Sequence, residues 1–232
     1  MASLIESKPR APEPAAVGAP AAADARAWCR YFEELYQGAE GDTTRVPWAR
    51  CQTNPALRAW LDSEAPALIR PGATACVVGC GLGDDVRELA DRGYDVVAFD
   101  VSPTAVQWAQ ARHPEIAPRF VVADLFNLPP SLQRRADLVV EINTLQAVHP
   151  DLRSQAAAGV VSLIRPRGTV LAICRGRDEG GPHPERPPFP LSPAELSALF
   201  AAHGLAPLRE LDDFLDEESP PVRRLRGAFR RA

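Results

Sequence analysis

No apolar run in this sequence is long enough to cross a bilayer, and its first residues lack the basic-then-apolar pattern of a secretory signal. The chain also lacks an excess of positive charge, because its formal net charge is -4 at pH 7. We therefore expect neither membrane nor nucleic acid as a partner. The 5 cysteines are an odd number without paired spacing, so we expect reduced thiols in a cytoplasmic protein.

Chemical signatures of several enzyme classes are missing too. No zinc-type cluster, magnesium-binding set or nucleophilic triad stands out, so we expect no metal. The 232 residues suit one domain. Residues 1–23 are rich in Ala and Pro and are predicted to be a flexible tail. The single domain is expected over residues 24–232, as a monomer or weak homodimer.

A glycine-rich stretch organises the chain. A short apolar run over residues 76–78 meets alternating glycines at Gly79, Gly81 and Gly83, and a helical pattern then leads to a second apolar run that ends at Asp100. This order predicts strand, loop, helix, strand and carboxylate. Glycines allow close approach of the backbone to a ligand, and Asp100 can accept hydrogen bonds from two ribose hydroxyls. The stretch predicts a nucleoside-containing cofactor.

The residues after the glycines indicate which cofactor it is. Asp84 stands where a dinucleotide loop has its third glycine, and Asp85 follows. Two carboxylates suit a helix start but repel a phosphate. A cofactor that carries an adenosine, a cationic sulfonium and no phosphate fits better, which favours S-adenosyl-L-methionine.

The segment before this stretch, residues 24–70, is predicted to be helical and aromatic. Aromatic side chains at helical spacing are typical of a core, but just before a cofactor domain they also suit a lid, and both interpretations stay open. Asn54 and Pro55 predict the start of a helix. The aromatic residues are Trp28, Tyr31, Phe32, Tyr36 and Trp48.

The remaining chain alternates strand and helix patterns. This alternation predicts an α/β fold, a Rossmann-like three-layer sandwich whose mainly parallel seven-stranded sheet ends in an antiparallel hairpin. Ligands bind at the carboxyl ends of such strands, where Asp100, Asp124 and Glu141 stand. The Pro- and Gly-rich loop at 175–191 is expected on the substrate side. Further strands are predicted at 120–123, 137–141, 169–174, 205–214 and 222–229, helices at 103–112 and from Ser192, a helix cap at Asp151, and a turn at 166–168.

These motifs resemble class I S-adenosylmethionine-dependent methyltransferases from about Trp28 onward. The resemblance rests on VVGCGLGDD, FDVSPTAV, VVADLFNLP and IRPRGTVLAI. Within that superfamily the chain is most similar to the thiopurine, thiol and halide methyltransferase-like branch, through the segment that ends at Trp48 and the stretches TLQAVHPDLR and PPFPLSPAEL. One departure weakens the case for an anionic or thiopurine acceptor: Ile142 stands where thiopurine-type relatives often have an Arg.

The resemblance implies roles for particular residues. The methionine part of the cofactor would lie against the glycine loop, the ribose against Asp100, the adenine against the segment after the third strand, the amino group near Glu141, and Trp48 would close the site. The cofactor-binding set is Trp48, Gly79, Gly81, Asp100, Val101, Asp124, Leu125 and Glu141.

Methyl transfer from a sulfonium is an in-line displacement, so it needs positioning more than chemistry from the protein. A thiol acceptor must lose its proton, and Glu141 and His149 are the candidate catalytic bases. For His149 the sequence favours a helix-start role beside Pro150 over catalysis. The leading hypothesis is methyl transfer to the sulfur of a small-molecule thiol. Transfer to oxygen or nitrogen, a nicotinamide-dependent oxidoreductase and a non-catalytic cofactor-binding protein are the alternatives.

Overall fold

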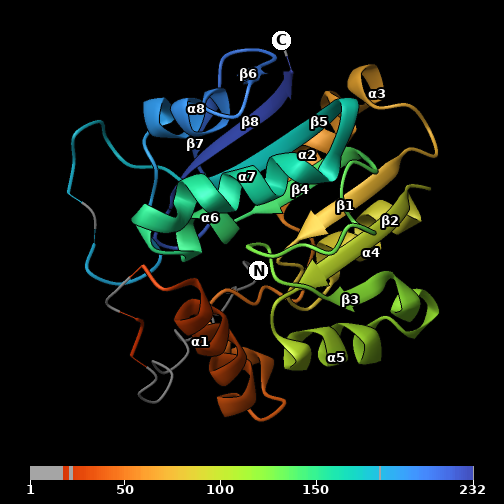
Figure 1. The fold of residues 1–232 in the computed structure, drawn as a ribbon, viewed down its shortest axis with the longest axis vertical. Coiled ribbons are helices and arrows are strands. Elements are labelled where there is room, and N and C mark those ends of the chain that lie inside the picture. The colour runs from red at the N-terminus through yellow and green to blue at the C-terminus, as the bar shows by residue number, and fades with distance from the viewer. Residues whose placement is uncertain (1–17, 21–22, 183, 232) are drawn as a thin grey trace, which may run out of the picture.

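Parallel strands and flanking helices make up most of the chain in the computed structural model, which describes residues 18–20, 23–182 and 184–231 (Figure 1). The tail predicted for residues 1–23 lies almost entirely outside the described residues. The strands are β1 (Thr74–Val78), β2 (Asp95–Asp100), β3 (Phe120–Val122), β4 (Ala136–Ile142), β5 (Ile164–Arg175), β6 (Leu205–Pro207), β7 (Asp212–Leu215) and β8 (Arg223–Arg231).

Helices connect and cover these strands. The α-helices are α1 (Ala25–Gly38), α2 (Pro55–Ser63), α3 (Ala65–Leu68), α4 (Asp84–Asp91), α5 (Pro103–Arg112), α6 (Thr144–Ala147), α7 (Arg153–Leu163) and α8 (Pro193–Ala201), and the 3-10 turns are η1 (Thr43–Arg45), η2 (Pro114–Arg119) and η3 (Pro150–Leu152). Within the described residues, no helix has the length and apolar character needed to cross a membrane.

The strands form one sheet in the order β3-β2-β1-β4-β5-β8-β6, with β7 also paired to β8. The first five strands in this order are parallel, and β8 is antiparallel to β5. The predicted architecture is confirmed, but the sheet has eight strands rather than seven. The strand expected at 205–214 is interrupted where Arg209 turns to pair with Glu64, so that β6 and β7 lie end to end along β8.

Two layers of helices bury the sheet. In Figure 1, α7 and α8 lie in front of the sheet and α2 lies behind it. On the α7 side, the apolar core includes Val139, Val160 and Phe200, and on the α2 side Leu57 packs with Val140, all of them 0% exposed. This arrangement is the predicted three-layer sandwich, and it directs the carboxyl ends of five parallel strands to one edge.

Side-chain caps fix three of the predicted helix starts. Asn54 accepts a hydrogen bond from the backbone of Ala56 at 2.9 Å at the start of α2, and Ser102 accepts one from Ala105 at 2.9 Å at the start of α5. Ser192 forms the capping box of α8. Because each cap satisfies a backbone N–H that the helix leaves free, these starts are determined locally.

The turn expected at 166–168 is a bulge inside a longer strand. Strand β5 begins at Ile164, its pairing with β4 shifts register between Ala136 and Leu138, and Arg167 adopts a positive φ of 68°. Gly168 is required at this bulge, because a Cβ there would lie 2.8 Å from the carbonyl oxygen of Ala136. The sequence pattern of a turn and of a bulge is the same here, since both need a local break in strand geometry.

Candidate active site

The glycine loop after β1 lies where the parallel strands end. Gly79, Gly81 and Gly83 all have positive φ, of 59°, 51° and 84°. A Cβ on Gly79 would lie 2.6 Å from Thr144 Oγ1, and one on Gly81 would lie 3.0 Å from the hydroxyl oxygen of Tyr36. Gly83 has a packing role instead, because its Cβ would meet the ring of Phe120 at 2.7 Å. The first two glycines therefore bring the loop close to α6 and to Tyr36 of α1.

Asp100 closes β2 directly beside this loop. Its Oδ2 accepts a hydrogen bond from the Gly81 N–H at 2.9 Å, and its Oδ1 accepts one from the Ser102 N–H at 3.0 Å. Only 7% of the residue is exposed, and burial raises the pKa of Asp100. Each carboxylate oxygen has a further lone pair, so the group can still accept hydrogen bonds from ribose hydroxyls.

The start of α4 carries negative charge, as its sequence predicts. Asp84 pairs with Arg112 at 2.9 Å, and the Asp85 carboxylate accepts a hydrogen bond from the Asn54 N–H at 2.7 Å. Burial raises the pKa of Asp85 to about 6. A phosphate at this helix start would meet two carboxylates, so the site fits a cofactor without phosphate.

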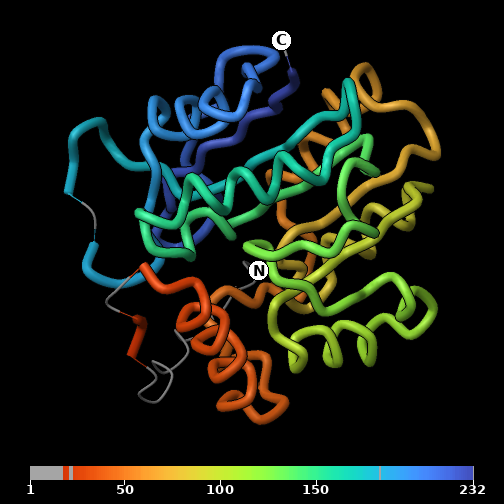
Figure 2. Tube along the Cα trace, viewed as in Figure 1, coloured from red at the N-terminus to blue at the C-terminus, as the bar shows by residue number. Residues whose placement is uncertain are grey.

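Helix α1 lies off the edge of the sheet at which β1 and β4 end (Figure 2). Trp48 is 39% exposed, and its indole N–H donates to the Tyr36 hydroxyl at 2.8 Å. Tyr36 itself is buried against Gly81. Sequence reasoning did not place Tyr36 in the site; its helical spacing from Trp28 and Phe32 was the available signal. Trp28 and Tyr36 of this segment therefore belong to the core, and the cover stays a prediction.

The Glu33 carboxylate connects α1 to the start of α5. Glu33 accepts hydrogen bonds from the Ser102 hydroxyl, from the Thr104 N–H at 3.2 Å and from the Thr104 hydroxyl at 2.8 Å. These bonds lower the pKa of Glu33 although burial opposes them. Helix α1 is thereby attached to the start of α5, next to Asp100.

Glu141 ends the central part of β4 and is 0% exposed. Its Oε1 accepts a hydrogen bond from the Leu145 N–H at 2.9 Å, whereas Oε2 is buried and has no hydrogen-bond partner among the described residues. Burial raises the pKa of Glu141 to about 7. A buried carboxylate oxygen without a partner is costly, and the ammonium of an amino-acid ligand would satisfy it.

Asp124 and Leu125 follow β3, the strand next to β2. The Asp124 carboxylate accepts a hydrogen bond from the Phe126 N–H at 2.8 Å. Burial, followed by the negative charge of Asp124, raises the pKa of the Cys29 thiol to about 12. Leu125 is buried against Gly159 of α7, so its side chain belongs to the core and its backbone is what it can offer to an adenine.

His149 lies between α6 and η3 in an aromatic cluster. Its ring centroid is 6.5 Å from that of Trp28 and 6.1 Å from that of Phe189. Its Nδ1 accepts a hydrogen bond from the Asp151 N–H at 3.3 Å. The predicted cap at Asp151 is therefore wrong: His149 starts this turn, because its ring reaches the free N–H while the Asp151 side chain points to solvent.

The predicted residues thus fall into connected groups. Gly81, Asp100, Tyr36 and Trp48 are joined by direct contacts. Glu141 and Gly79 both contact α6, Glu141 through the Leu145 N–H and Gly79 through Thr144. The Thr144 hydroxyl also donates to the Val78 carbonyl at 3.3 Å. Val101 is half-buried beside Asp100. No described His, Cys, Asp and Glu side chains form a group of three or more that could hold a metal.

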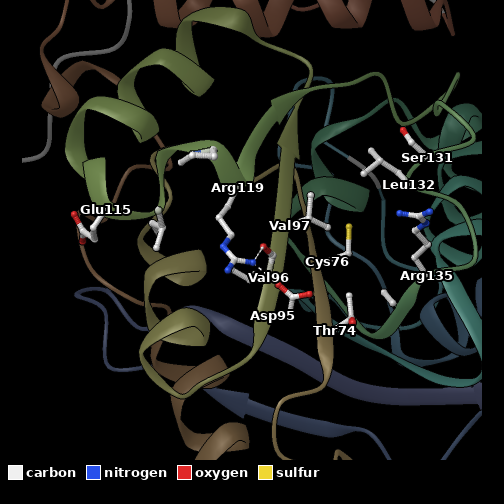
Figure 3. Close-up of a pocket in the computed structure, with 13 residues that line it drawn as sticks. Thr74, Cys76, Asp95, Val96, Val97, Glu115, Arg119, Ser131, Leu132 and Arg135 are labelled. Carbon is white, nitrogen blue, oxygen red and sulfur yellow. Dashed lines mark hydrogen bonds and ion pairs between the residues drawn. The ribbon is translucent and has the colours of Figure 1, made fainter.

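A cavity of about 600 Å³ lies elsewhere, at the amino ends of β1 and β2 (Figure 3). Cys76 and Val97 line it, and Arg119 pairs with Asp95 at its rim. The chain between β3 and β4 forms turns rather than a helix in the described residues, which leaves this face of the sheet open. None of the predicted site residues lines this cavity.

Comparison with solved structures defines the class of fold. The chain superimposes on Burkholderia thailandensis 1,6-didemethyltoxoflavin-N1-methyltransferase, solved with 1,6-didemethyltoxoflavin and S-adenosylhomocysteine, with a TM-score of 0.72, 21% identity and coverage of 93% of each chain. The fold is therefore that of a Rossmann-like methyltransferase.

Sequence comparison narrows the class to one family. The chain belongs to the thiopurine S-methyltransferase family, whose profile matches residues 40–229. The chain is 25% identical to probable thiol methyltransferase 2 of Arabidopsis thaliana, in an alignment that covers 73% of this chain and 73% of that protein. It is 26% identical to a probable thiopurine S-methyltransferase of Yarrowia lipolytica, in an alignment that covers 78% of this chain and 92% of that protein. The protein is an S-adenosyl-L-methionine-dependent methyltransferase with a small-molecule acceptor. This membership decides against the nicotinamide-dependent alternative.

Proposed function

We propose that this enzyme methylates the sulfur of a small-molecule thiol. The observation that carries the proposal is the aromatic cluster formed by Trp28, Tyr31, Phe32, His149 and Phe189 beside the end of β4. Aromatic faces make favourable contacts with sulfur and with a sulfonium cation. The thiol and thiopurine methyltransferases to which the chain is similar support the same acceptor.

The cluster is tied to the end of β4 by backbone contacts. The Phe189 N–H donates to the Gln146 carbonyl at 2.7 Å, and the Leu145 N–H of the same helix donates to Glu141. Arg153 secures this corner, because its guanidinium donates to the carbonyls of Leu145 and Phe189. An acceptor held among these rings would lie next to the cofactor edge of the sheet.

In the proposed site, Gly79, Gly81 and Glu141 hold the methionine part of the cofactor, Asp100 and Val101 the ribose, and Asp124 and Leu125 the adenine, under Tyr36 and Trp48. When bound, the cofactor supplies an electrophilic methyl group on sulfur. The acceptor sulfur would form the new bond to that methyl carbon, and the electrons of the broken bond would stay on the cofactor sulfur. The protein aligns these atoms, excludes water and removes the thiol proton.

Calorimetric titration with S-adenosylmethionine, S-adenosylhomocysteine and NAD tests the cofactor assignment, and a screen of thiols, phenols and amines with mass detection of the methylated product tests the acceptor. We expect saturable binding of both adenosyl compounds without NAD, and turnover of thiols. Methylation of phenols or amines alone would transfer the proposal to an oxygen or nitrogen acceptor. Binding without any turnover would indicate a non-catalytic protein.

Cofactor affinity should depend on pH through Glu141. Because the pKa of this carboxyl is about 7, it is largely neutral at pH 5.5 and ionised at pH 7.5. A ligand ammonium binds the ionised form, so the Kd of S-adenosylhomocysteine should fall as pH rises, by up to about tenfold per unit below pH 7. Titrations of the wild type and of Glu141→Gln measure this; a slope that survives in the variant would contradict the assignment.

His149 is proposed to accept the thiol proton. His149→Ala should lower kcat/KM for a thiol by roughly 100–10,000-fold near pH 7, the usual contribution of a general base. The loss should shrink at a pH above the pKa of the thiol, because the thiolate then needs no base. His203→Ala, which removes an exposed histidine bonded to the Ser154 carbonyl, is the matched control. A deficit that stays constant with pH would leave His149 with only its helix-start role.

A further inference from the structure

Three arginines gather where β5 ends and β8 begins. Arg175 and Arg224 are directly opposite each other in the antiparallel pairing of these strands, so their side chains share one face of the sheet. The third is Arg50, from the segment between Trp48 and α2. Its guanidinium pairs with Glu218 and lies 3.8 Å from the Asp216 carboxylate.

The carboxylates in contact with this cluster, Asp216 and Glu218, already form ion pairs with two of the arginines. Arg224 donates to Asp216 at 2.7 Å and to Glu218 at 2.7 Å, and Arg50 pairs with the same two carboxylates. The Arg175 guanidinium forms no hydrogen bond or ion pair with any residue that the structure describes. The three cations face Asp216 and Glu218, and Asp85 also acts on the charge of Arg50. Among the three, Arg175 is the guanidinium without a direct hydrogen bond or ion pair to a described residue.

Arg175 is held in place although its charge has no direct partner. Its backbone N–H donates to the Gln146 side chain, and its carbonyl accepts a hydrogen bond from the Leu191 N–H at 3.0 Å. The side chain is half-buried, and burial followed by the charge of Arg224 and then that of Arg50 lowers the pKa of Arg175, with Asp216 acting in the opposite direction. Asp216 is committed to Arg224, so it reduces but does not satisfy this charge.

Strand order places the cluster one strand beyond β4, at the carboxyl edge of the sheet. Strand β5 is next to β4, which carries Glu141, and three strands from β2, which carries Asp100. At a strand spacing of about 4.8 Å, the end of β5 is roughly 14 Å from the ribose position but only one strand from the proposed methionine position. Arg224 borders the same place, because its guanidinium is 3.5 Å from the Asn143 side-chain oxygen just after β4.

We propose that Arg175 recognises a carboxylate or similar anionic group on the methyl acceptor. A planar guanidinium binds such groups through two parallel hydrogen bonds, and a half-buried one does so with little competition from water. The proposal rests on the proposed methyl transfer and names its substrate class. It also supplies, from the neighbouring strand, the positive charge that Ile142 does not provide after β4.

Binding and turnover test this separately. Titration of benzoate into the complex with S-adenosylhomocysteine should show binding to the wild type and about 10–100-fold weaker binding to Arg175→Gln, as expected for the loss of a charged hydrogen-bonded pair. In turnover, kcat/KM for 2-mercaptobenzoate should fall by a similar factor, whereas that for thiophenol should stay unchanged. The matched control is Arg223→Gln. Arg223 lies beside Arg224 in β8 and pairs with Asp213 of β7.

Several outcomes would overturn the proposal, and one would separate it from the proposed methyl transfer. Absence of benzoate binding to the wild type, or equal binding to both forms, would show that Arg175 does not hold an anion. Weaker binding of S-adenosylhomocysteine with unchanged binding of methylthioadenosine would assign Arg175 to the cofactor carboxylate. If benzoate binds as expected but neither thiol is methylated, the thiol-transfer function fails while anion recognition stands.

Discussion

Replacing Asp100 with alanine should weaken the binding of S-adenosylmethionine and S-adenosylhomocysteine by about 100-fold or more, since hydrogen bonds to a charged group contribute about 1.5–3 kcal/mol each. The substitution removes the proposed partner of the ribose hydroxyls and also the acceptor for the N–H groups of Gly81 and Ser102. Isothermal titration measures the loss. The cofactor affinity of Asp100→Asn, which keeps one acceptor oxygen, should lie between those of the wild type and of Asp100→Ala.

The control for this experiment is Asp95→Ala at the other end of the same strand. Asp95 is exposed and pairs with Arg119, so its removal changes a surface contact and leaves the ribose position intact. Thermal unfolding of both variants separates lost binding from lost folding. Wild-type cofactor affinity in a folded Asp100→Ala protein would show that the ribose is bound elsewhere.

Gly79→Ala should abolish most activity, and for two separable reasons. Its φ of 59° is strained for alanine, at a cost of about 1–3 kcal/mol. Its Cβ would also meet Thr144 Oγ1 at 2.6 Å and occupy the surface proposed for the methionine part of the cofactor. We expect a lower unfolding temperature and a fall in kcat/KM of about 100-fold, in line with a small misplacement of reacting groups.

The double variant Gly79→Ala/Thr144→Ala distinguishes these causes. Removing the Thr144 hydroxyl relieves the internal collision, so part of the stability should return. The methyl group on residue 79 would still face the cofactor, so binding of S-adenosylhomocysteine should stay weak. Recovery of both stability and binding would mean that Gly79 is needed only for packing against α6.

Local signals carried most of the fold prediction. Asn54, Ser102 and Ser192 lie in sequence contexts whose hydrogen bonds are made within three residues, and their helices begin where predicted. The division of the predicted last hairpin into β6 and β7 depends on Arg209 meeting Glu64, which is 145 residues away. A pattern read along the chain does not contain that contact.

The site shows the same division. Asp100 was predictable because a strand-end acid after a glycine loop is a local arrangement. Tyr36 was not, because spacing indicates that an aromatic residue is buried but not against what, and its partner Gly81 comes from another element. Arg175 stands in a run of charge and proline that predicts only a loop; its importance depends on Arg224 being opposite it and on the acids already being paired.

Ser102 connects helix α1 to the carboxylate at the end of β2. Its hydroxyl donates to Glu33 of α1, and its N–H donates to Asp100. Suppose that α1 moves away to admit a ligand. Ser102, which donates to the Asp100 carboxylate proposed to bind the ribose, would then lose its hydrogen bond to Glu33. We therefore expect cofactor exchange to be slow while α1 is docked and the acceptor to come and go faster than the cofactor, an ordered sequence in which S-adenosylhomocysteine leaves last.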